Sequence, residues 1–325
     1  MEQSSKSHTP VRRYCLDPSD SLGTSFLLTP GVISGGTVTH DCPLSRSVGY
    51  FLEPLIALAP FCKKQLRLTL RGITADDRDL SVDLVRTVTL PHLALFGLDT
   101  GLELKVRSPP AQNISHTRRS QNAAQRRSAA AKSTFHVPPP NSSHPSTSPT
   151  PEKYSASAAL LRVGADKCPR MIDSARTILN RYIPDIYLVP DIYRTQDSGK
   201  SPGFGITLVA TSTTGVLHSA EAIAQPGSLA DEIGKTAARL LLSEIRHGGC
   251  VDRNHQWLVL LFMALGPQDV ARCRMGPLTP KSVQLLRDMK EFFGTSFKIA
   301  PADESEDLIL SCLGTGYINT NKTAA

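Results

Sequence analysis

The chain has 325 residues, of which 40% are apolar, so it is long enough for one large or two ordinary domains with a real hydrophobic core. Its seven cysteines are odd in number and form no C-x-x-C pair, which argues against a disulfide framework and favours a reducing compartment. The formal charge of +7 at pH 7 leaves room for a polyanionic partner, and the longest apolar run, residues 257–265, is too short to cross a membrane.

The first ordered part, residues 28–107, is expected to form a compact α/β unit. Apolar residues between positions 44 and 58 recur at helical spacing, and residues 65–71 alternate in the manner of a half-buried strand. A second helix and a second strand follow, so the order helix, strand, helix, strand predicts a layered arrangement.

The second helix of this unit is predicted over residues 82–96, with Ser81 as its N-cap and Gly97 as its stop, and extended structure resumes at 102–106. Four carboxylates lie in the preceding turn and the first helical turn, where the helix dipole favours negative charge. We therefore interpret them as capping residues rather than as a Mg²⁺ site. They are Asp76, Asp77, Asp79 and Asp83.

Residues 108–158 have a low-complexity composition that cannot bury enough apolar surface to fold, and we predict that they are disordered. No acidic residue occurs between Leu104 and Pro151. The arginine pairs of this segment suit nuclear import or attraction to RNA, although a solvated disordered segment would have the same composition. The pairs are Arg118-Arg119 and Arg126-Arg127.

Order returns in two further stretches, 160–247 and 248–319, which alternate helical and extended patterns. The near-continuous apolar run WLVLLFMALG is most simply a buried helix. The predicted helices cover residues 171–182, 229–245, 257–265 and 279–293, and the predicted strands cover residues 185–189, 204–211, 297–299 and 308–312.

The stretch DSGKSPGFG, residues 197–205, contains the Gly-Lys-Ser ending of a nucleotide-binding phosphate loop. Such a loop needs a glycine five residues before the Gly-Lys pair and a helix after it. Here Arg194 stands at the glycine position, and the following residues have the pattern of a strand. We therefore interpret the stretch as a turn that binds no triphosphate, and we expect no bound cofactor.

Several stretches, taken together, resemble the RNA 3'-terminal phosphate cyclase superfamily, and within it the cyclase-like proteins of the eukaryotic nucleolus. They include TPGVISGGTVTHDCPLSRSVGYFLEPLIALAPF, LRGITADDRDLSVDLVRTVTLP, IPDIY, SGKSPGFG, ARLLLSEIRHGGCVD and FFGTSFKI. The match covers residues 28–107 and 160–319, in order. The residues that we take as its signature are Gly35, Gly36, His40, Asp41, Arg71, Gly72, Ser198, Gly199, Lys200, Ser201, Pro202, Gly203 and Gly205.

The resemblance implies an α/β (α+β) fold with a large domain of repeated βαβαββ-type units and a smaller α/β insert domain. The large domain would comprise residues 28–107 and 248–319, and the insert residues 160–247, with a divergent N-terminus at 1–27 and a tail at 320–325. Two departures from the family pattern, before residue 30 and after Arg107, imply a truncated first unit and the loss of strands from a packed sheet. We interpret them as an altered splice form or gene model.

For function, the resemblance implies a non-cyclase factor of the small-subunit processome in the nucleolus, which supports early pre-rRNA cleavage. Its implied partners are a large nucleolar GTPase and pre-rRNA, and no association with a membrane is expected. Active cyclases of the superfamily adenylylate a histidine, whose imidazole nitrogen attacks the α-phosphate of ATP. In register, that position falls on Asn254 and the acidic residue before it on Arg253, and an amide is no substitute nucleophile. His255 lies one position away, which on a helix rotates a side chain by about 100°.

The alternative is an enzyme, either a residual cyclase or a pre-rRNA endonuclease. For cleavage, Asp288 could bind a metal or orient water, while Arg287 and Lys290 hold a scissile phosphate. A single carboxylate gives little support to a nuclease site, because two-metal nucleases use several carboxylates. A patch that binds RNA or a protein is the simpler interpretation of these three residues. The sequence His247-Gly248-Gly249-Cys250 lacks a companion pair, so we expect no zinc or other metal site.

Overall fold

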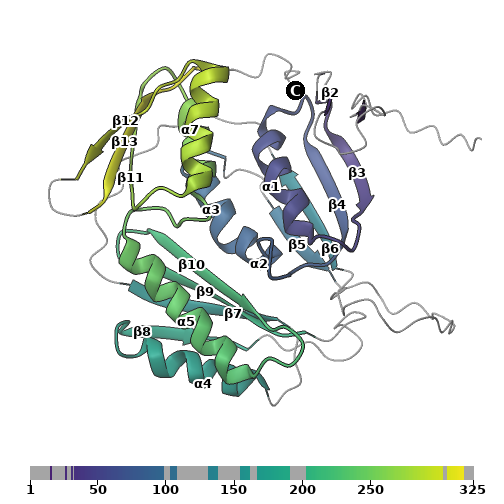
Figure 1. Cartoon of the computed structure of the whole chain (residues 1–325). Helices are drawn as coiled ribbons and strands as arrows, with labels where there is room; N and C mark the ends of the chain where they lie inside the picture. Colours follow the sequence, from purple (N-terminus) through teal and green to yellow (C-terminus); the bar gives the residue numbers. More distant parts are fainter. Residues whose placement is uncertain are drawn as a thin grey trace, which may run out of the picture.

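The computed structural model describes residues 15–16, 26–27, 31, 33–98, 103–107, 131–137, 154–161, 167–190, 203–302 and 306–317. The described residues form helices and four small sheets, so the prediction of a mixed α/β protein is confirmed (Figure 1). The repeated βαβαββ units and the residue bounds of the domains stay predictions. Within the described residues, no helix has the length and hydropathy needed to cross a bilayer. A two-stranded ribbon, β1 (Cys15–Leu16) with β2 (Phe26–Leu27), precedes the larger elements.

The first large sheet has the strand order β3-β4-β6-β5. Strands β3 (Gly36–Asp41) and β4 (Leu66–Gly72) are parallel, and α1 (Val48–Leu58) and the 3₁₀ turn η1 (Ala59–Phe61) connect them. Strand β6 (Ala131–Val137) lies antiparallel between β4 and β5 (Glu103–Arg107).

The disorder predicted for residues 108–158 does not hold throughout, because β6 and the first residues of β7 (Tyr154–Leu161) are strands within it. Composition failed here because a ladder between strands uses main-chain N–H and C=O groups, which nearly every residue type supplies. The arginine pairs of this segment lie outside the described residues.

The second helix of the first unit forms where predicted, but as a helical segment with a π turn inside it. It consists of α2 (Val82–Leu84), η2 (Val85–Thr89) and α3 (Leu90–Ala94). The Ser81 hydroxyl accepts the N–H of Leu84 at 3.1 Å, which confirms the predicted N-cap. Gly97 has a φ of 71°, as expected of a glycine that ends a helix.

A second α/β part runs from β7 to α5 and has the sheet order β10-β9-β7-β8. We call it the insert, although β7 begins before the predicted boundary at residue 160. Two helices, α4 and α5, cover one face of this sheet and pack on each other (Figure 1). The two helices approach closely at Gly234, where an added Cβ would lie only 2.2 Å from the Met171 carbonyl oxygen. The remaining bounds are α4 (Lys167–Leu179), β8 (Asp185–Leu188), β9 (Gly205–Ser212), β10 (Leu217–Ile223) and α5 (Ala230–His247).

The last part contains the buried helix that WLVLLFMALG predicts, α6 (Gln256–Leu265), and α7 (Pro280–Phe293). A three-stranded antiparallel sheet accompanies them in the order β11-β13-β12. Its strands are β11 (Val270–Met275), β12 (Lys298–Pro301) and β13 (Leu308–Leu313).

The core is divided between two main clusters. One joins α1, β4, the 82–94 segment, α6 and the β11–β13 sheet, and the other lies between the insert sheet and its two helices. A small third cluster, Leu84, Val88 and Val209, joins the helical segment to the insert. The insert is therefore packed on the rest of the protein rather than merely tethered to it.

Candidate functional site

A cavity of about 730 Å³ lies where the insert meets the rest of the protein. Its wall combines α1, the turn at residues 76–80, strand β10, helix α5, the residues before α6, and the start of α7. Side chains of both charges and one aromatic ring line it. They include Arg46, Tyr50, Asp79, Glu221, Arg253, Asn254 and Lys281.

Arg46 is fixed on one side of this cavity. Its guanidinium forms a two-pronged ion pair with Asp79, with Nε 2.9 Å from Oδ2, and stacks 4.0 Å from the centre of the Tyr50 ring. Hydrogen bonding from Arg46 lowers the pKa of Asp79, outweighing the opposing effect of burial. Asp79 also accepts the N–H of Ser47 at 3.2 Å.

The interpretation of four capping carboxylates is therefore corrected, since only Asp83 lies in the first helical turn. Asp79 holds Arg46, and Asp77 accepts a hydrogen bond of 2.9 Å from the amide of Gln225. Asp76 accepts the main-chain N–H of Asp79 at 2.8 Å and so shapes the turn. The capping argument from the dipole failed because the turn before the helix folds back onto α1 and the insert.

Glu221 of β10 supplies the contact between the insert and the helical segment within the cavity wall. Its Oε1 accepts the main-chain N–H of Ser81 at 3.2 Å. Burial raises the pKa of Glu221 to about 7, and hydrogen bonding from Ser81 only partly opposes the shift. This carboxyl therefore titrates near neutral pH, although most carboxyls are fully ionised there.

Asn254, which occupies the predicted nucleophile position, is exposed and lines the cavity. Arg253 beside it forms an ion pair with Glu244 of α5, with Nε 2.7 Å from Oε1. The amide nitrogen of Asn254 is bonded to a carbonyl carbon and has no free electron pair suited to attack on phosphorus. The side chain that faces the cavity at this position can hydrogen-bond a ligand but cannot form a covalent adenylate.

His255, the neighbouring imidazole, lies in the protein interior and not among the residues that line the cavity. Asn254 and His255 both belong to the turn before α6, so the helical rotation from which we predicted separate orientations does not apply to them. His255 is 0% exposed. Its Nδ1 lies 2.5 Å from Oδ1 of Asp252, and its Nε2 lies 2.7 Å from the hydroxyl oxygen of Thr89. Both ring nitrogens are thus occupied by protein groups.

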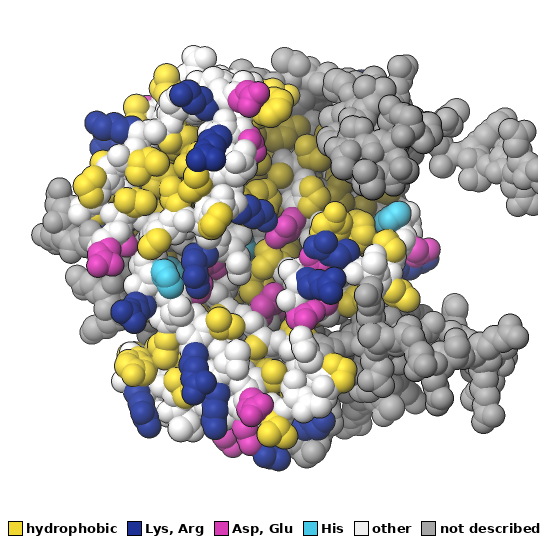
Figure 2. Space-filling model, viewed as in Figure 1, with side chains coloured by type: hydrophobic (Ala, Val, Ile, Leu, Met, Phe, Trp, Pro, Cys, Tyr) yellow, Lys and Arg dark blue, Asp and Glu magenta, His cyan; other side chains and the backbone are white. Residues whose placement is uncertain are grey.

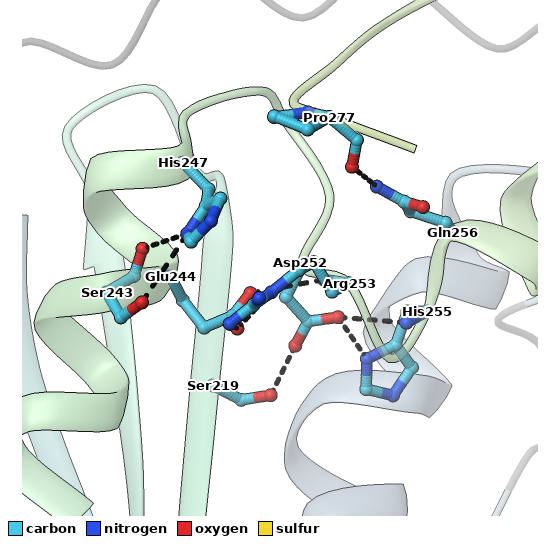
Figure 3. A network of polar contacts seen from close by, with 9 residues as sticks. All are labelled: Ser219, Ser243, Glu244, His247, Asp252, Arg253, His255, Gln256 and Pro277. Carbon is cyan, nitrogen blue, oxygen red and sulfur yellow. Dashed lines mark hydrogen bonds and ion pairs between the residues drawn. The ribbon is translucent and has the colours of Figure 1, made fainter. Parts of the chain in front are cut away.

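The carboxylate of Asp252 is shared between His255 and the insert, because Ser219 of β10 donates its hydroxyl to the other oxygen (Figure 3). Burial acts to raise the pKa of Asp252, but the nearby His255 and the hydrogen bonds from His255 and Ser219 outweigh it, and the pKa is about 2. Asp252 is therefore a buried, fully ionised acid held by donors from two parts of the fold.

Asp252, His255 and Thr89 have the connectivity of a catalytic triad, in which an acid orients a histidine that faces a hydroxyl. The stacked ring of His92 covers this group, with ring centres 5.2 Å apart and planes within 3°. Thr89 is 2% exposed, so a substrate carbonyl or phosphate has no approach to its hydroxyl. The arrangement is consequently a structural network. Burial, followed by the effect of His255, lowers the pKa of His92 to about 4, so this ring is neutral at pH 7.

The other predicted patch lies on α7, apart from the residues that line the cavity. Asp288 accepts a hydrogen bond of 2.8 Å from the amide of Gln284, while Arg287 and Lys290 are exposed. In the part of the chain that the structure describes, no group of three or more His, Cys, Asp or Glu side chains could hold a metal ion. The imidazole of His247 lies 2.5 Å from the Ser243 carbonyl oxygen.

The signature residues that the structure describes shape strands and turns and do not line the cavity. Gly35 has a φ of 71°, and a Cβ there would lie 2.1 Å from the Lys64 carbonyl oxygen. Arg71 and Asp41 form an exposed ion pair of 3.4 Å at the ends of β4 and β3. Residues 198–202, with the Gly-Lys-Ser turn, lie outside the described residues, but β9 follows them as the predicted strand.

Sequence reasoning missed three cavity residues, Arg46, Asp79 and Glu221, as functional groups. A charged residue inside the apolar stretch LHSAEAI was the one signal for Glu221. The pairing of Arg46 with Asp79 spans 33 positions and leaves no local pattern.

Comparison with known proteins gives one family for nearly the whole chain. The family model described as RNA 3'-terminal phosphate cyclase matches residues 16–299. A human protein named RNA 3'-terminal phosphate cyclase-like protein is 40% identical over 319 residues, which cover 94% of this chain and 82% of that protein. The rRNA processing protein rcl1 of Schizosaccharomyces pombe is 36% identical, covering 92% and 80%. The rRNA processing protein RCL1 of Saccharomyces cerevisiae is 35% identical, covering 93% and 81%.

Proposed function

This chain belongs to the RNA 3'-terminal phosphate cyclase family, and we propose that it is a member without cyclase activity that acts in ribosome biogenesis. In this proposal it works in the nucleolus as part of the small-subunit processome, where early cleavages of pre-rRNA yield the small-subunit rRNA. A large nucleolar GTPase and the pre-rRNA are its partners. The names of the two yeast relatives, rRNA processing protein, support the role.

The observation that carries the non-cyclase part is the placement of Asn254 and His255. Asn254 faces the cavity where a nucleophile would be needed, and an amide cannot form a phosphoramidate. His255 is 0% exposed and hydrogen-bonded through both ring nitrogens, so it cannot reach a nucleotide without local unfolding. The cavity keeps Arg46, Arg253 and Lys281 in its wall, and in this proposal it serves recognition rather than group transfer.

The alternative of an endonuclease centred on Asp288 has less support. Its carboxylate is hydrogen-bonded to Gln284, and no cluster of acids accompanies it among the described residues. Two-metal cleavage needs several such ligands around one scissile phosphate. Because Arg287 and Lys290 are exposed, a surface contact with RNA or protein explains them more simply than catalysis does.

Adenylylation of the purified protein tests the non-cyclase part directly. Incubation with ATP labelled on the α-phosphate should leave no covalent label after denaturation. A family member that carries the motif histidine serves as the positive control. Label that disappears in the variant His255→Ala would overturn this part of the proposal, because it would show that the buried imidazole becomes accessible.

Replacing the endogenous protein by this chain in cells tests the ribosomal role separately. Depleting the endogenous protein and expressing this chain should restore the level of mature small-subunit rRNA, measured by hybridisation to precursor and product. Affinity purification from the same cells should recover pre-rRNA and the GTPase. Normal small-subunit rRNA after complete depletion, or purification of neither partner, would remove the proposed role.

A further inference from the structure

We propose that the exposed face of α5 binds the phosphate backbone of RNA through Lys235, Arg239 and Arg246. This inference rests on the proposed function, which makes RNA a partner, and adds a surface that the family resemblance does not assign. Figure 2 shows Lys and Arg side chains over the two helices of the insert, on the face turned toward the viewer.

The three cations form a stripe along one side of the helix. At 100° per residue, positions 235, 239 and 246 lie within about 40° of one another around the axis. They span about 16 Å along it, since each residue rises by about 1.5 Å. All three side chains are exposed, and α5 is continuous from Ala230 to His247, so the spacing is fixed before any ligand arrives.

The stripe lacks the counter-charges that neutralise other cations of the insert. Arg170 pairs with Asp231 at 2.7 Å, and Arg253 is paired with Glu244. No ion pair links any of the three stripe residues to a described residue. Two acids lie one turn before Lys235, namely Glu232, which is exposed, and Asp231, which is paired with Arg170.

Like charges four positions apart on a helix destabilise it by a few tenths of a kcal/mol. Lys235 and Arg239 have this spacing. A polyanion laid along the helix would relieve their repulsion and release its condensed counterions at the same time. A row of phosphates fits better than a single acidic side chain, because it offers negative charge along the full length of the stripe.

The stripe also borders the cavity described above. Ile233, Thr236 and Leu240 of the same helix line that cavity. Thr236 and Leu240 lie about 80° and 120° around the helix axis from the centre of the stripe. Across the cavity, Lys281 at the start of α7 is 71% exposed. RNA held on α5 would thus pass the rim of the cavity, with its backbone positioned by the stripe and its bases free of sequence-specific contacts with it.

The test measures the binding of fluorescein-labelled oligouridine to the full chain by anisotropy over a range of salt concentrations. The variant Lys235→Glu, Arg239→Glu, Arg246→Glu should weaken binding roughly 100-fold at 0.1 M salt. It should also make the slope of log K against log salt shallower by about 2, because three phosphate contacts on a single strand contribute about 0.7 each. The control variant Lys63→Glu, Lys64→Glu, Arg67→Glu changes three exposed cations of the body by the same charge and should bind nearly as the wild type does.

Equal losses in the two variants would overturn the proposal, since they would show that net charge rather than the stripe governs binding. Unchanged binding in the α5 variant would overturn it as well, as would loss of a protein partner with RNA binding intact. If the glutamate variant fails to fold, the triple glutamine variant replaces it, with a slope change as the readout. Oligouridine binding by the pure protein is independent of ribosome assembly, so the surface and the proposed role can fail separately.

Discussion

The Nδ1 atom of His255 lies 2.5 Å from Oδ1 of Asp252, inside the protein and away from the cavity that its neighbour Asn254 lines. Adjacent residues thus face different environments. The imidazole that could attack a phosphate orients a buried carboxylate, and the amide that cannot attack is the group presented to a ligand.

Replacing Asp252 by asparagine should destabilise the fold by about 3 kcal/mol, because His255 and Ser219 lose a charged acceptor in the interior. Urea denaturation at pH 7 measures the change. The pKa of Asp252 falls from 3.8 to about 2 on folding, so its ionisation stabilises the protein above pH 4 and this contribution is lost as the pH falls toward 2. The gap between wild type and variant should narrow over that range. Asp173→Asn, at an exposed site, should change stability by less than about 0.5 kcal/mol.

Replacing Glu221 by glutamine should stabilise the protein by about 2 kcal/mol at pH 8. The folded carboxyl has a pKa of about 7 and the ordinary value is 4.5, so the folded state holds a proton that the unfolded state releases between these values. Wild-type stability should therefore decline from pH 4.5 to 7, whereas the variant should lack that decline. Thermal unfolding of both proteins between pH 4.5 and 8 measures this decline. Parallel curves of stability against pH for the two proteins would contradict the raised pKa of Glu221. Asp77→Asn, an exposed hydrogen-bonded acid, is the control.

Removing the Ser81 hydroxyl should cost about 1 kcal/mol, because the N–H of Leu84 at the start of the helical segment then lacks its acceptor. The variant Ser81→Ala can be compared by urea denaturation with Thr236→Ala, which removes an exposed hydroxyl from the interior of α5. Equal midpoints for the two variants would show that the cap contributes nothing to stability.

Truncating Leu260 to alanine should cost about 3 kcal/mol, because α6 is buried on nearly every side and Leu260 is 0% exposed. Leu95→Ala, at a leucine that is 50% exposed, makes the same chemical change at the surface and should cost less than about 1 kcal/mol. The difference between the two free energies of unfolding tests whether α6 is a core helix. Similar small losses at both sites would place α6 at the surface.

The sequence predicted the elements whose pattern is local. The apolar run of α6, the cap at Ser81 and the stop at Gly97 all lie within a few residues of the structure that they specify. Strands β3, β10 and β11 were not predicted. Strand β3 (GTVTHD), for example, is exposed at most of its positions and has no apolar alternation. Such a strand is specified by its partner, here β4 through parallel pairing. Only the three-dimensional structure supplies that information.

The candidate site was predictable only where it depends on residues that are close together in the sequence. The register of the family motif gave Asn254 and led us to expect that His255 points elsewhere, although the two residues lie in the turn before α6 and not on the helix that this expectation assumed. Glu221 and the ion pair of Arg46 with Asp79 could not be inferred, since they form where residues distant in sequence meet. The insert had to be placed against the helical segment before burial could identify Glu221.

The hydroxyl of Ser219 ends on Asp252, and the neighbouring residues Leu217 and Val251 pair through an isolated parallel bridge. Swinging the insert outward would remove the Ser219 donor from an ionised carboxylate in a medium of low polarity and leave it only the contacts with His255, so a hinge motion between the two parts is opposed. The amides of β10 should then exchange with deuterated solvent no faster than the most protected amides of α6.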